Sequence, residues 1–257
     1  MKTILAWCYG IFAYLTGFSS LVLFILFTVH PDFLSTVSEG GILLNMNPWV
    51  VNFFLIALFG IQHSVMARPA FKHWLHQFIK EPFERSTYLI SSSIPLLLLV
   101  IFWQPINGIF WTFDSHTATV LGYGFAILGW SLVLATTFLI NHFDLFGLRQ
   151  IYYYVKNKPY SAIEFKTPFL YRVVRHPMQL GVVIGVFSTA TMTTGHALLA
   201  FGMTLYILIG LYFEERDLIK LFGERYREYQ RNVHKLIPLP KLKLTIKSNA
   251  SENQFNP

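Results

Sequence analysis

Long uncharged apolar runs are the feature that most restricts what this 257-residue chain can fold into. About 20 apolar residues in a helix are enough to cross a hydrocarbon core about 30 Å thick. Four runs of that kind are followed by two shorter ones, which the sequence MTTGH joins as a tight turn. We therefore predict an all-α polytopic membrane bundle of about 5–6 transmembrane helices, with the short fifth run packed partly inside it. The runs are 4–29, 49–67, 88–103, 119–140, 178–191 and 197–213.

The composition supports this class and excludes others. Hydrophobic residues make up 54% of the chain and charged residues only 13%, which argues against a soluble domain. Cys8 is the one cysteine, so neither a disulfide framework nor a thiolate metal site is available, and we predict no metal. The net charge of +7 is confined to particular loops, a pattern of membrane orientation and not of nucleic-acid binding.

The loops predict an orientation. The segments 30–48, 104–118 and 192–196 contain no Lys or Arg. All 20 basic residues lie near the N-terminus, in 68–85, in 149–175 or after Glu215. Because cytoplasmic loops carry the excess of Lys and Arg, both termini are predicted to face the cytoplasm.

Two polar blocks flank the last two apolar runs. Arg175 and His176 precede Pro177, which suits the first turn of a helix, and helix N-termini readily hold anionic groups. Glu214 and Glu215 follow the last run, so both blocks should meet at the cytoplasmic face. One glutamate could hold a ribose diol or a cationic ligand while the other pairs with Arg175 or Arg216. The alternative interpretations are that the basic residues before Pro177 only set the membrane topology and that Glu214 and Glu215 form a solvated helix end.

Two further polar groups border the spans. His142 follows the fourth run and is a candidate general base, with Asp144 either orienting it or capping a helix. His63 and Ser64 lie near the cytoplasmic end of the second run. Polar residues at that depth mark a substrate site or form hydrogen bonds between helices.

The C-terminal region is polar. Leu218, Leu221, Phe222, Tyr229 and Val233 recur at helical spacing and predict an amphipathic helix on the cytoplasmic face. Gly223 interrupts this helix, and two prolines after residue 237 end it. Residues 241–257 form a polar tail that we predict to be disordered.

Three strings, RHPMQLG, EExxLxxxFGxxYxxY and VxxLIPxxP, resemble the isoprenylcysteine carboxyl methyltransferase superfamily. The upstream strings IQHSVMARPAFK, ERSTY and NHFDLFGLRQ resemble its bacterial branch of methanethiol S-methyltransferases and NnrU-related proteins. The resemblance implies one integral membrane methyltransferase domain over 1–240 in a bacterial inner membrane. Its cofactor part would cover about 141–240.

The resemblance also implies S-adenosylmethionine as cofactor, with S-adenosylhomocysteine as its product. The cofactor would lie between the last two spans and the C-terminal segment. The family usually has tyrosine where this chain has Gln179, and Gln150 matches a family glutamine. The implied contacts are Gln150, Tyr171, His176, Pro177, Met178, Gln179, Glu214 and Glu215.

The acceptor is predicted to be a small apolar thiol, because the arginine with which prenylcysteine enzymes bind a carboxylate has no counterpart in ILIGLYFEE. Methanethiol would give dimethyl sulfide by direct displacement. The thiolate is the nucleophile, so His142 is the candidate base, with Asp144 orienting it and Arg149 favouring the thiolate. His63 and Ser64 are the candidate substrate contacts.

Other functions remain open at this point. The acceptor could be hydrogen sulfide, a longer thiol or a lipid-like thiol. A non-enzymatic NnrU-like membrane protein is a further alternative, although the chain retains His176, Pro177 and both glutamates. An ion channel is poorly supported, because the first, third and fourth runs lack charged residues in their middles. The oligomeric state is not predicted.

Overall fold

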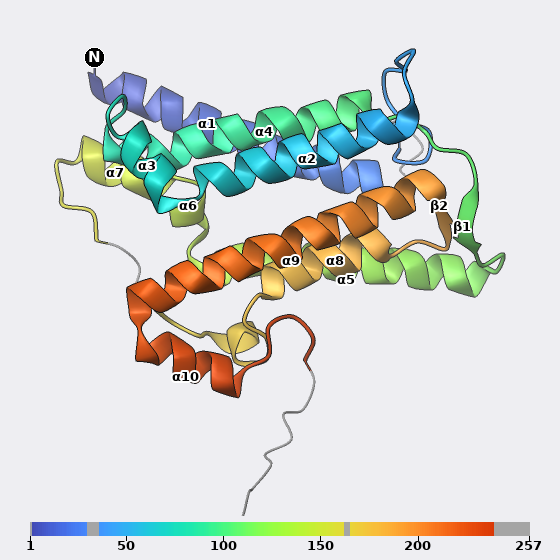
Figure 1. Cartoon of the computed structure of the whole chain (residues 1–257). Coiled ribbons are helices and arrows are strands. Elements are labelled where there is room, and N and C mark those ends of the chain that lie inside the picture. Colours follow the sequence, from blue (N-terminus) through green and yellow to red (C-terminus); the bar gives the residue numbers. More distant parts are fainter. Residues whose placement is uncertain (1, 30–35, 162–164, 239–257) are drawn as a thin grey trace, which may run out of the picture.

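The computed structural model describes residues 2–29, 36–161 and 165–238 and is a helical bundle with almost no sheet (Figure 1). The predicted fold class is confirmed. The predicted tail, 241–257, lies outside the described residues. The helices that run along the bundle are α1 (Lys2–Val29), α2 (Pro48–Met66), α4 (Glu84–Phe102), α5 (His116–Ile140), α8 (Pro177–Phe187) and α9 (Thr194–Phe222).

Five helical segments within the described residues are long and apolar enough to cross a membrane. The exception among the bundle helices is α8, whose 11 residues give a length of about 16 Å. This is short of the hydrocarbon thickness. The predicted short fifth run is therefore a partial helix, packed beside α5, α9 and α1.

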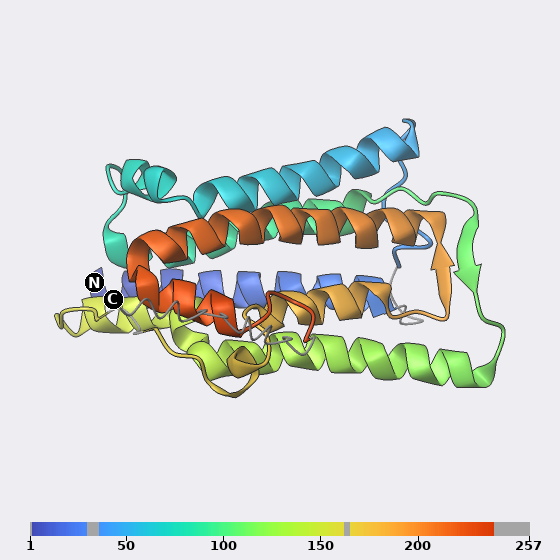
Figure 2. The same cartoon turned by 60° about the horizontal axis from the view of Figure 1, so that its bottom comes forward.

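The short elements divide between the two ends of the bundle. The end that carries the N-terminus also carries α3 (Pro69–Leu75), α6 (His142–Leu145), α7 (Leu148–Val155) and α10 (Glu224–Asn232), and the opposite end carries β1 (Ile109–Thr112) and β2 (Thr191–Thr193). Figure 2 shows the same division from a second side. The described residues of 68–85, 149–161, 165–175 and 216–238 therefore lie toward one end of the bundle.

The opposite end differs in detail from the sequence prediction. The MTTGH segment was expected to be a tight turn, but its beginning is β2, which pairs antiparallel with β1. Thr193 then caps α9 by accepting a hydrogen bond from the His196 backbone N–H. Alternating threonine and apolar residues favour an extended backbone here, and a partner strand 80 residues earlier is not visible in local sequence.

The C-terminal helix is also divided differently. The sequence placed the end of the last span at Phe213, but α9 continues as one helix to Phe222. Gly223, with φ of 58°, ends it as predicted and reverses the chain into α10. Glycine reaches this conformation without the steric cost that a Cβ imposes. The polar block of Glu214 and Glu215 therefore lies on the last two turns of a spanning helix.

The bundle interior is apolar, and Trp103, Leu99 and Phe27 are among its fully buried side chains. Phe53 and Phe138 on the outer face are more than 60% exposed, as a lipid-facing surface requires. The contact between α5 and α8 depends on glycine. A Cβ on Gly181 would lie 2.6 Å from the Gly129 carbonyl oxygen. Small residues at this crossing therefore let the two helix backbones approach closely.

Candidate active site

Glu215 is the centre of a buried ion-pair network where α8 meets α9. Its Oε1 accepts hydrogen bonds from Arg175 Nε at 2.7 Å and from His176 Nε2 at 3.1 Å. Its Oε2 lies 3.1 Å from Lys235 Nζ. The side chains of Arg175, His176 and Glu215 are each no more than 8% exposed. The predicted pairing of one glutamate with Arg175 is confirmed.

The same residues fasten the C-terminal segment to the start of α8. The backbone N–H groups of Arg175 and His176 donate to the carbonyls of His234 and Lys235. Arg175 Nη1 also donates to the carbonyl oxygens of Gln230 and Val233. Arg175 Nη1 therefore holds the last turn of α10 and the residue that follows it, while Nε of the same side chain binds Glu215. The network fixes the C-terminal segment against the first turn of α8.

Glu214, the neighbouring carboxylate, has a different environment. It is half-buried and has no hydrogen bond or ion pair within the described part of the chain. Tyr171 lies near it, in a short 3-10 helix at Phe169–Arg172. Burial, followed by the Glu214 charge, raises the pKa of Tyr171, which stays protonated at neutral pH. Glu214 also acts electrostatically on the phenols of Tyr88 and Tyr206. It is thus a carboxylate available to a ligand.

The first turn of α8 borders these two glutamates. Pro177 is its first residue, as predicted, and is buried. Met178 packs against the core cluster, and Gln179 is half-buried. The N–H groups of a first helical turn have no partner within their own helix and attract negative charge. His176 immediately before them carries its imidazole toward Glu215.

His142 is enclosed and fully hydrogen-bonded. The Thr137 hydroxyl gives its hydrogen to the Leu134 carbonyl, so it accepts from Nδ1–H of His142 at 2.8 Å. Nε2 is then the basic nitrogen, and the Tyr14 hydroxyl occupies it at 3.1 Å. The ring stacks on Phe138 with centroids 4.3 Å apart. Burial lowers the pKa of His142, which keeps it neutral at pH 7.

Asp144 is not oriented toward His142, as the sequence analysis expected. Its Oδ1 accepts from Arg149 Nη1 at 2.9 Å and from the Tyr160 hydroxyl at 2.8 Å. Both nitrogens of His142 already have hydroxyl partners, so His142 has no free N–H left to donate to the Asp144 carboxylate. Gln150 Nε2 donates to the Asp144 backbone carbonyl, while Gln150 Oε1 is buried without a partner in the described chain. That oxygen is free to accept from a bound ligand.

His63 and Ser64 lie inside the bundle on α2. The His63 ring packs against Phe59 and Tyr88, and Ser64 lies beside Tyr206. His63 Nδ1 is buried and has no partner within the described residues. The Tyr88 hydroxyl donates to the His63 carbonyl at 3.4 Å. Tyr88 and Tyr206 thus connect this pair to Glu214, and the pair is separate from the hydroxyl partners of His142.

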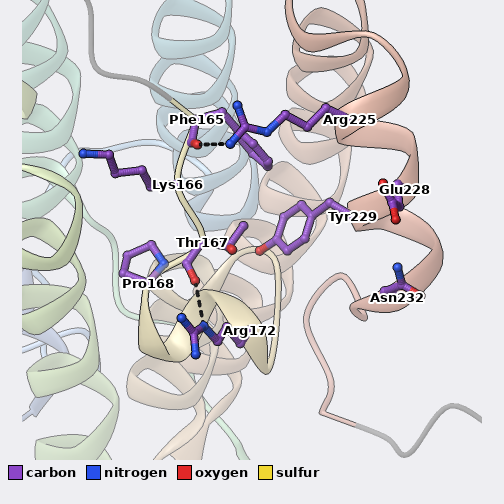
Figure 3. Close-up of a pocket in the computed structure, with 9 residues that line it drawn as sticks. All are labelled: Phe165, Lys166, Thr167, Pro168, Arg172, Arg225, Glu228, Tyr229 and Asn232. Carbon is purple, nitrogen blue, oxygen red and sulfur yellow. Dashed lines mark hydrogen bonds between the residues drawn. The ribbon is translucent and has the colours of Figure 1, made fainter.

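A cavity of about 530 Å³ opens between residues 165–172 and α10 (Figure 3). Tyr229 separates it from Tyr171, whose carbonyl accepts from the Tyr229 hydroxyl. Neither glutamate of the pair lines this cavity. The residues that line it are Phe165, Lys166, Thr167, Pro168, Arg172, Arg225, Glu228, Tyr229 and Asn232.

Comparison with known proteins decides the family. The phospholipid methyltransferase family model matches residues 117–225. Methanethiol S-methyltransferase 1 of Bradyrhizobium diazoefficiens is 42% identical over 91% of this chain and 82% of its own length. The chain belongs to the methanethiol S-methyltransferase family.

Two further relatives carry the same family name. The protein of Mycobacterium tuberculosis is 47% identical over 74% of this chain and 78% of its own length. That of Crocosphaera subtropica is 41% identical over 90% of each chain. No solved structure matches. The chain is accordingly an integral membrane enzyme with methyltransferase activity, as the motifs predicted.

Sequence reasoning on this methyltransferase missed several residues of the site. Lys235 stands only as part of the VxxLIP string, but its ammonium group pairs with Glu215. Tyr206 precedes Glu214 by eight residues on α9, a spacing that returns to the same helix face. A polar side chain within an apolar run at that spacing was the available signal. Tyr14 and Tyr160 gave no local signal, because their partners are distant in sequence.

Proposed function

We propose that this enzyme transfers a methyl group from S-adenosylmethionine to methanethiol, giving dimethyl sulfide and S-adenosylhomocysteine. The observation that carries this proposal is the identity of 41–42% over nine-tenths of the chain with proteins named methanethiol S-methyltransferase. The site supports it, because Glu214 and Gln150 offer half-buried acceptors that no described residue uses. The proposed substrate is therefore a small thiol, and the enzyme is surrounded by the lipid bilayer.

The residues present fit the cofactor. We assign its binding to Gln150, Tyr171, His176, Pro177, Met178, Gln179 and Glu214, with Glu215 in support. Glu214 can accept hydrogen bonds from a ribose diol or offset the sulfonium charge. The cofactor supplies an electrophilic methyl group. The protein holds the adenosyl moiety, excludes water and aligns the thiol, and alignment of this kind is worth up to about 7–11 kcal/mol.

Glu215 acts through His176 in this proposal. The carboxylate holds Nε2 of His176, and Arg175 and Lys235 offset its charge. A ligand contact by Glu215 would require one of these bonds to be given up. Glu215 therefore positions the first turn of α8, and Glu214 contacts the ligand.

The acceptor side lacks a group that would bind a carboxylate. Arg149 is paired with Asp144, and no arginine precedes Glu214 on α9. Of the predicted catalytic residues, Asp144 and Arg149 are proposed to order the loop that carries Gln150. The role of His142 as a base stays a prediction, and it would require the Tyr14 hydroxyl to move away from Nε2. Hydrogen sulfide and longer thiols are the competing acceptors.

We propose that the enzyme lies in a bacterial inner membrane with both termini in the cytoplasm. The segments that carry the basic residues gather at the end of the bundle that holds α3, α7 and α10. The positive-inside rule assigns that end to the cytoplasm. The cofactor would then enter the site from the cytoplasm.

The test is product formation by the purified enzyme. Detergent-solubilised protein is incubated with S-adenosylmethionine and methanethiol, and dimethyl sulfide is measured in the headspace. Glu214→Gln should abolish most product, while Glu224→Gln, a change at an exposed carboxylate, should not. Cofactor binding without product would mean another acceptor, and hydrogen sulfide and longer thiols would then be assayed. Absence of cofactor binding would contradict the proposal and support a non-enzymatic protein.

A further inference from the structure

His63 is held in a cage of three rings inside the bundle. Its ring centroid lies 5.3 Å from Phe59, 5.0 Å from Tyr88 and 6.1 Å from Tyr206. Nδ1 of His63 is buried without a partner in the described part of the chain. A buried nitrogen of this kind is rare in folded proteins, because its desolvation is not offset. The cage therefore leaves a specific polar atom ready for a ligand among apolar walls.

The cage adjoins the proposed cofactor carboxylate. Its walls come from α2, α4 and α9, and α2 packs against both of the other helices. Glu214 acts electrostatically on Tyr88 and Tyr206 of the cage and also on Tyr171, which precedes α8. Glu214 thus stands between the cage and the start of α8. The titratable and charged groups around His63 are Arg68, Arg85, Tyr88, Tyr206 and Glu214.

The two interior histidines differ in the state of their nitrogens. His142 has hydroxyl partners on both, and the basic one is occupied by Tyr14. His63 keeps Nδ1 without a partner among the described residues. Proton abstraction needs a nitrogen lone pair within hydrogen-bond reach of the thiol. Of these two histidines, His63 offers this without breaking a hydrogen bond within the described residues.

We propose that His63 binds the acceptor thiol and takes its proton during methyl transfer, an assignment that rests on the proposed function. The S–H proton moves to Nδ1 of His63, and the sulfur forms a bond to the donor methyl carbon. The bond between that carbon and the sulfonium sulfur breaks, and its electron pair stays on the departing sulfur. His63 then returns its proton to water. The rings of Phe59, Tyr88 and Tyr206 contact the methyl group of methanethiol.

The experiment measures the pH dependence of turnover in His63→Gln. Removal of a general base lowers the rate by about 10²–10⁴-fold near neutral pH. The variant can use only thiol that is already ionised, so its kcat/KM should rise tenfold per pH unit and approach the wild type in alkali. The affinity for S-adenosylmethionine, measured by titration calorimetry, should stay within twofold of the wild type. His73→Gln, at an exposed histidine on α3, should match the wild type throughout.

Three outcomes would overturn the assignment. The first is an unchanged rate in His63→Gln. The second is a loss of the same size at every pH, which is expected of a structural residue. The third is a loss of kcat/KM that is recovered as the pH rises in His142→Gln but is not recovered in His63→Gln. If the wild type binds no cofactor or forms no dimethyl sulfide, the proposed function itself fails.

Discussion

Two adjacent glutamates at the end of the last spanning helix have opposite surroundings. Glu215 is buried and pairs with Arg175, His176 and Lys235. Glu214 is half-buried, faces tyrosines, and has no hydrogen bond or ion pair in the described chain. Successive helical residues point about 100° apart, which sends one toward the C-terminal segment and the other toward the cage of His63.

The difference separates anchoring from ligand binding. A buried carboxylate with three hydrogen-bonding partners is satisfied, and removal of it leaves the Arg175 charge buried without its acceptor. A carboxylate without partners near protonated phenols costs free energy unless a ligand uses it. We therefore propose that the Glu215 network holds the site together and that the region around Glu214 binds the substrates.

The largest effect is expected from Glu215→Ala. This change leaves Arg175 and His176 buried without their acceptor, which costs about 3–5 kcal/mol of unfolding free energy. Thermal unfolding in detergent measures the loss. Glu224→Ala, at an exposed pair, should change stability by no more than about 0.5 kcal/mol. Equal unfolding temperatures for Glu215→Ala and the wild type would contradict the anchoring role of Glu215.

Glu214→Gln should act on binding and not on stability. Loss of a hydrogen bond to a charged group costs about 1.5–3 kcal/mol, so the dissociation constant for S-adenosylmethionine should rise about 10- to 150-fold. The unfolding temperature should stay near that of the wild type, because no described residue pairs with Glu214. Calorimetric titration supplies the measurement. An unaltered affinity would remove Glu214 from the cofactor site.

Gly181→Ala tests whether the stability of the protein depends on how closely α8, which begins beside the Glu215 network, approaches α5. The added methyl group would lie 2.6 Å from the Gly129 carbonyl oxygen, so the helices must separate. Overpacking of this kind costs about 1–3 kcal/mol. Thermal unfolding measures it, with Gly210→Ala as the control, since nothing lies within 4 Å of a Cβ there. Matching stabilities in the two variants would contradict a tight contact.

The smallest effect is the pH dependence that His142 contributes. Burial lowers its pKa in the folded state, so the unfolded chain binds the proton more readily. Stability is therefore complete above the unfolded pKa of about 6.5 and falls as the pH drops below it, by up to about 1.4 kcal/mol per pH unit. Unfolding temperatures at pH 7.5 and 5.5 should diverge more in the wild type than in His142→Gln. Parallel changes in both proteins would show that His142 is not the group responsible.

Much of the site was predictable because its signals are local. Pro177 begins α8, Gly223 ends α9, and one glutamate pairs with Arg175, as the motifs indicated. Which glutamate is paired was not predictable. That depends on the position of Lys235 after α10, where its ammonium group reaches Glu215. Sequence periodicity does not predict this long-range contact. The orientation of His142 by Asp144 was expected from proximity in sequence, but Thr137 and Tyr14 provide its hydrogen bonds instead.

The sequence by itself determined that the chain is a membrane-embedded helical bundle and which family it belongs to. Hydrophobic run length and short motifs encode both, and neither depends on distant contacts. Only the tertiary structure decided the partners of each ionisable group. Glu215 is bound to Arg175, His176 and Lys235, Glu214 has no such partner in the described chain, and His63 is enclosed by rings from three helices. The physical reason is that a side chain's hydrogen bonds depend on helix rotation and packing. Differences of one residue in helical phase change its surroundings entirely.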